Sequence, residues 1–153
     1  MKIKSIFLVC LLASPLCSYC QPCLSGGIEF SNQSQIDDFP TNFPACTQIL
    51  GDVKITGSNI SNLDGLSNLT SIGGTLTIHG TPIQTDLSAL NNLDSVGGDI
   101  LIASNNSLPS LNGLNNLTQA KGHVIISNNG ALVSLDGFAK LIVRKTFQII
   151  YNP

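Results

Sequence analysis

The sequence predicts a β solenoid with coils of about 24 residues, because apolar triplets and short apolar strands both recur at that interval behind a segment of different character. Each triplet has the spacing L-x-x-L-x-x-L, and each begins 24 residues after the one before. A fixed period over several copies is the signature of stacked coils that share one core. The triplets are Leu63, Leu66, Leu69; Leu87, Leu90, Leu93; Leu111, Leu114, Leu117; and Leu135, Phe138, Leu141.

Every coil is expected to contain one short strand. Two inward apolar residues enclose one outward residue in each segment, and strands stacked about 4.8 Å apart form a parallel sheet. Gly73-Gly74 and Gly97-Gly98 precede two of these strands, where a tight bend or a positive φ would favour glycine. The expected strands lie at 53–55, 76–78, 100–102 and 124–126.

The last copy departs from the repeat. Arg144 and Lys145 stand near the expected glycine pair, and aligning Phe147 with Val124 needs one residue fewer than 24. We expect a truncated reading frame to leave an open apolar edge here; the alternative is that a partner, or self-association with a second copy, covers this edge. The repeat solenoid spans 50–153, with coils at about 50–74, 75–98, 99–122 and 123–146 and an incomplete coil at 147–153.

Residues 1–20 have the pattern of a secretory signal peptide. Lys2 and Lys4 precede an apolar run at 6–12, which small and polar residues follow. The run is too short to span about 30 Å of hydrocarbon, and no later segment approaches the ~20 apolar residues of a membrane helix. We therefore expect no transmembrane segment, cleavage after Cys20, and a protein that is secreted or held at the cell surface.

Cysteine spacing predicts a disulfide and no metal site. Cys17, Cys20 and Cys23 form a C-x-x-C-x-x-C pattern, but two of them leave with the signal peptide. Export places Cys23 and Cys46 in an oxidising compartment, where a disulfide would close a loop of about 24 residues and contribute about 3 kcal/mol. The bond defines residues 21–49 as a disulfide-closed N-terminal cap. No cofactor is expected.

The cap has its own pattern. Ile28 begins a short alternating strand, Ser31 or Asn32 can cap one or two helical turns, and Pro40 is expected to stop them. The first coil of a solenoid has a bare apolar end that such a unit must cover. The expected covers are Phe30, Phe39 and Phe43.

Charge and composition argue against a nucleic-acid partner. Only 10% of the 153 residues are charged, the net charge is −2, and there is no Trp. Binding to phosphates needs clustered Lys and Arg, whereas the basic residues after position 20 are scattered along the chain.

Asparagines recur in two columns. One column holds Asn68, Asn92 and Asn116; the other holds Asn105 and Asn129. Stacked asparagines can bond along the axis and satisfy backbone groups of the turns. We favour this structural ladder over glycan attachment, although several of the positions also lie in N-x-[ST] sequons.

No catalytic constellation is evident. Asp64 and Asp136 lie in a turn where the other copies lack an acid at that position, which indicates turn formers. His79 and His123 occupy different strand positions in coils that are not adjacent, and no third partner points to a triad or a metal. We therefore expect a protein that is not an enzyme.

A candidate binding face lies on the outward side of the predicted sheet. Exposed apolar residues among polar ones often mark contacts on soluble proteins. The alternative, which we favour, is ordinary β-propensity on a solvent face, since isolated exposed aliphatic residues are common. The candidate residues are Thr77, His79, Leu101, His123 and Ile125.

The repeat L-x-x-L-x-x-L-x-x-[IV]-G-G-x-[LI]-x-I resembles the receptor L-domain type of leucine-rich repeat, and most resembles bacterial secreted proteins that carry such coils behind a signal peptide. The segment "FSNQSQIDDFPTNFPACTQILGDVKITG" resembles their N-terminal cap, and the resemblance covers about 23–153. It implies a right-handed, LRR-like β-helix with a short αβ cap, displayed outside the cell, that binds and does not catalyse.

Two functional classes follow. The first is an extracellular binding or adhesion module for an unknown protein or glycan ligand; the scarcity of aromatic residues argues against carbohydrate stacking. The second is a structural spacer repeat in a larger surface protein. A β-helix enzyme acting on polysaccharides is the remaining alternative.

Overall fold

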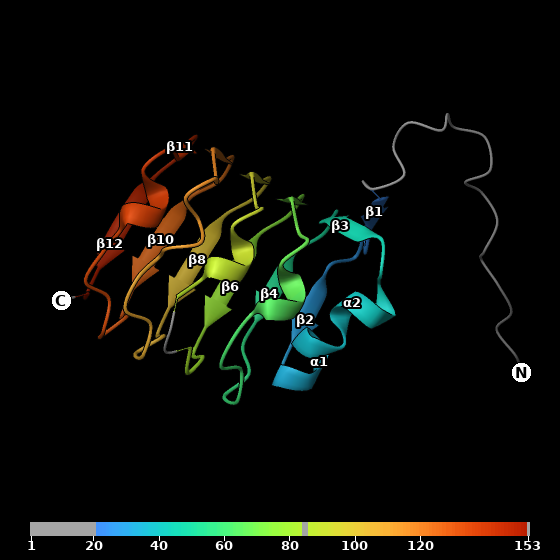
Figure 1. Ribbon diagram of the computed structural model, residues 1–153. Coiled ribbons are helices and arrows are strands. Elements are labelled where there is room, and N and C mark those ends of the chain that lie inside the picture. The colour runs from blue at the N-terminus through green and yellow to red at the C-terminus, as the bar shows by residue number, and fades with distance from the viewer. Residues whose placement is uncertain (1–20, 84–85, 153) are drawn as a thin grey trace, which may run out of the picture.

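The computed structural model describes residues 21–83 and 86–152, which form a solenoid-like stack of coils with two parallel sheets of six strands each (Figure 1). The narrow sheet contains β1 (Gln21–Cys23), β3 (Cys46–Ile49), β5 (Ser71–Ile72), β7 (Ser95–Val96), β9 (Gln119–Ala120) and β11 (Ile142–Val143). The broad sheet contains β2 (Ile28–Phe30), β4 (Val53–Ile55), β6 (Leu76–His79), β8 (Ile100–Ala103), β10 (Val124–Ser127) and β12 (Phe147–Ile150).

The register of the broad sheet follows the sequence repeat. Leu76 pairs with Ile100, and Ile100 pairs with Val124, so that equivalent residues of successive coils lie side by side. Val124 pairs with Phe147, the one-residue-shorter alignment that the sequence indicated. The structure thus confirms a parallel sheet of stacked repeats.

The core runs the length of the stack between the two sheets and the turns. The first three leucine triplets are fully buried, with at most 2% of each side chain exposed, whereas all three residues of the last triplet are only partly buried. Short 3₁₀ helices carry the middle residue of three triplets, and they are η1 (Asp64–Leu66), η2 (Ser88–Leu90) and η3 (Asp136–Phe138).

The N-terminal coil contains two short helices, α1 (Gln33–Asp37) and α2 (Phe39–Asn42). Asn32 caps α1, because its side-chain oxygen accepts a hydrogen bond of 3.1 Å from the Gln35 amide. The prediction that Pro40 stops the helical segment is wrong. Pro40 lies in the first turn of α2, where the missing N–H has no intrahelical partner to lose.

Aromatic side chains fill the N-terminal coil. Phe30 and Phe39 are buried, with ring centroids 5.6 Å apart, and Phe43 is partly buried beside Phe39. The predicted disulfide is confirmed: Cys23 of β1 is bonded to Cys46 of β3, with a Cα–Cα distance of 5.6 Å. Closing this loop contributes about 3 kcal/mol by reducing the entropy of the unfolded chain.

The glycine pairs lie in bends, as one of the two expectations had it, but without a positive φ. The described residues with positive φ do not include Gly73, Gly74, Gly97 or Gly98. These glycines lie where adjacent coils touch backbone to backbone: a Cβ on Gly97 would overlap the carbonyl oxygen of Gly73. Close approach between coils, and not a left-handed conformation, therefore requires glycine here.

Candidate functional site

The outer face of the broad sheet carries a continuous column of side chains. Lys54, Thr77, Leu101 and Ile125 lie side by side on consecutive strands from β4 to β10. Lys54 is exposed, and the other three are half-buried. The structure therefore places three of the five predicted face residues side by side along one line.

The two histidines lie on opposite flanks of this column. His79 is exposed at the end of β6, in register with the buried Ala103. His123 precedes β10 on the other flank and is half-buried. The structure does not bring the imidazoles together, and neither histidine extends the column of Leu101 and Ile125.

The flank that holds His123 is a ladder of backbone-capping side chains. Asp52 accepts a hydrogen bond from the Thr75 amide at 2.7 Å, and Asp99 accepts one from the His123 amide at 2.7 Å. The Thr75 hydroxyl accepts from the Asp99 amide at 3.3 Å. A Cβ on Gly122 would overlap the Asp99 carboxylate, so glycine at this point leaves room for the ladder. Asp99 thus caps the next coil.

The inner asparagine column is buried and fully bonded. The Asn105 side-chain oxygen accepts from the amide and hydroxyl of Thr81 at 3.0 and 2.8 Å, and its Nδ2 donates to the Ile78 carbonyl at 2.9 Å. Asn129 repeats the arrangement and accepts from the Asn105 amide at 3.0 Å. Asn152 continues it at the last coil. Sequence reasoning missed Thr81, because it stands where the later coils have Asn.

The outer asparagine column differs, since its members reach backbone carbonyls and not one another. Asn92 donates to the Ser67 carbonyl at 2.8 Å, and Asn116 donates to the Asn91 carbonyl at 2.9 Å. These side chains and Asn68 are exposed. The side-chain amides of Asn92 and Asn116 link each turn to the coil before it, so these hydrogen bonds give the outer asparagine column a structural role.

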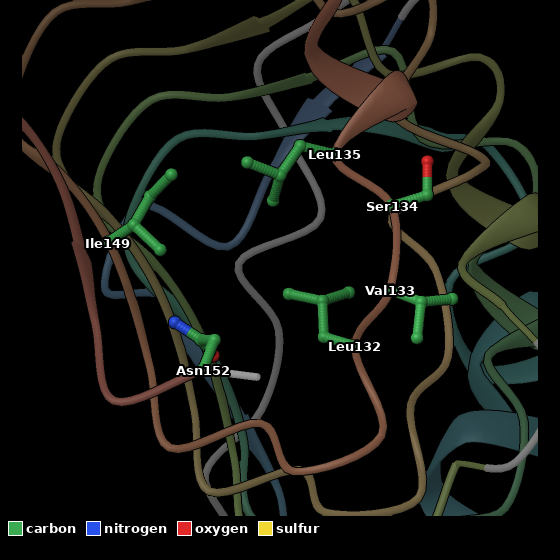
Figure 2. A pocket seen from close by; sticks show the side chains of 6 residues that line it. All are labelled: Leu132, Val133, Ser134, Leu135, Ile149 and Asn152. Carbon is green, nitrogen blue, oxygen red and sulfur yellow. The ribbon is translucent and has the colours of Figure 1, made fainter.

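The C-terminal end of the stack is open. Leu132 and Leu135 face Ile149 and Asn152 across a hollow of about 390 Å³, whereas Val133 points away from it (Figure 2). A second hollow, of about 310 Å³, lies between Phe138, Leu141, Val143 and Phe147. Inward-facing positions of the last strand are therefore exposed: 43% of Phe147 and 48% of Ile149.

Charged groups are few on the broad sheet. Lys54 Nζ donates to Glu29 Oε1 at 2.9 Å, and this hydrogen bond, with that from Thr56, lowers the pKa of Glu29. Among the described residues there is no group of three His, Cys, Asp or Glu side chains that would hold a metal ion. Residues 21–83 and 86–152 contain no helix that is long and apolar enough to cross a membrane. The predicted signal peptide lies outside the described residues.

Comparison with known protein families finds a similarity over the middle of the chain. The family model described as Receptor L domain matches residues 45–112. This range extends from the strand of Cys46 through two coils and into the third, and it includes Thr77, His79 and Leu101 of the candidate face. No curated protein matches the chain.

Proposed function

We propose that this chain is a non-catalytic, ligand-binding extracellular module of the receptor L-domain type, and that it recognises a protein through the outer face of the broad sheet. The observation that carries the proposal is the column from Thr77 to Ile125, a line of half-buried side chains that no other described element covers. An aliphatic strip bordered by polar groups is a common form of contact surface. The family similarity at 45–112 supports a binding role.

Two further features belong to the proposal. The Cys23–Cys46 bond fits an oxidising compartment, and residues 1–20 would direct the chain there as a signal peptide for secretion or surface display. We assign right-handed, leucine-rich coils, because connections between parallel strands of one sheet are right-handed in about 98% of cases. A protein ligand is favoured over a glycan because the column offers aliphatic side chains and no aromatic ring.

The test compares two placements of the same chemical change. Leu101→Lys/Ile125→Lys puts charge in the column, while Val133→Lys puts it on a side chain that is 84% exposed elsewhere. Each purified variant is applied to a panel of immobilised extracellular-matrix proteins and to a glycan array. We expect the parent and Val133→Lys to bind the same protein, and the double variant to lose about tenfold or more in affinity.

Three outcomes would overturn the proposal. Undiminished binding by the double variant would show that the column does not take part in ligand recognition. Binding to neither panel by the parent chain would favour the spacer, and glycan binding alone would contradict the proposed class of ligand.

A further inference from the structure

We draw no further inference here: the strongest candidate, the hollow of about 230 Å³ that β2, α1 and α2 line at the N-terminal end of the stack, holds partly buried Phe43 and the exposed Asp38 in its lining, but nothing in the structure shows what covers it.

Discussion

The two ends of the stack both carry apolar residues that point inward, among them Phe30 and Ile149 at equivalent positions of the first and last strands, yet the two ends differ sharply in burial. At the N-terminal end Phe30 is 1% exposed and Phe39 3% exposed, whereas at the C-terminal end Phe147 is 43% exposed and Ile149 48%. The repeat determines the direction in which a side chain points, but only a neighbouring coil removes it from water. Burial in a stack of this kind is thus a property of coil pairs, and the residue pattern alone does not report it.

Truncation of one aromatic ring at each end should show the largest difference. Phe39→Ala removes a buried ring that contacts Phe30 and Phe43, and we expect a loss of about 3–5 kcal/mol in the free energy of unfolding. Phe147→Ala removes a ring that is nearly half exposed, and about 1 kcal/mol should be lost. Urea denaturation measures both values.

Equal losses in the two variants would show that the last coil is as well covered as the first.

The periodic features of the fold could be predicted from the sequence. The leucine triplets and the strands near 76–78 and 100–102 share one period, and that period sets the register of the broad sheet. The pairing of Cys23 with Cys46 followed from the number of cysteines left after residue 20. Each of these predictions depends on which residues recur or remain, and that can be read from the sequence without knowing which coils touch.

Features that depend on contact between coils could not be predicted in the same way. Strands β5, β7, β9 and β11 contain two residues each, too few for alternation to be recognised, so the narrow sheet was missed. The reason for glycine at 97 is the carbonyl of the coil before it. The carboxylate of Asp99 accepts a hydrogen bond from the amide of His123, which belongs to the next coil. In all three cases the partner lies in another coil.

The buried asparagine column offers a smaller contrast between the middle and the end of the stack. Asn105→Ala leaves the Ile78 carbonyl and the Thr81 amide without their partner in the interior, at a cost of about 2–3 kcal/mol. Asn152→Ala removes the equivalent bonds to Ile126 and Asn129, where the site is only partly buried and water can replace the amide, so about 1 kcal/mol should be lost.

Thermal and urea unfolding of the two asparagine variants checks this order. Asn92→Ala is the control, because its exposed amide bonds a single carbonyl. If Asn105→Ala lowered the free energy of unfolding no more than Asn92→Ala does, the buried asparagine column would not act as a stabilising ladder, and Asn105 would need another explanation.

The smallest expected effect concerns the outer face of the broad sheet. Glu29 of β2 lies beside Lys54 at one end of the column there, and Gln148 of β12 lies beside Ile125 at the other. Hydrogen bonds from Lys54 and Thr56, and then the charge of Lys54, hold the pKa of Glu29 below its ordinary value of 4.5. A carboxylate whose pKa is lower in the folded than in the unfolded chain stabilises the fold above the unfolded pKa, and this contribution disappears as the pH falls through the folded value.

Glu29→Gln gives the first coil the neutral residue of the last. We expect its urea midpoint to lie slightly below that of the parent at neutral pH, and the two midpoints to converge in acid. In a Lys54→Met background the substitution should have almost no effect, because the main partner is gone. A difference that stays constant from neutral pH into acid would show that the amide changes packing of the strand edge and that the ion pair adds no stability.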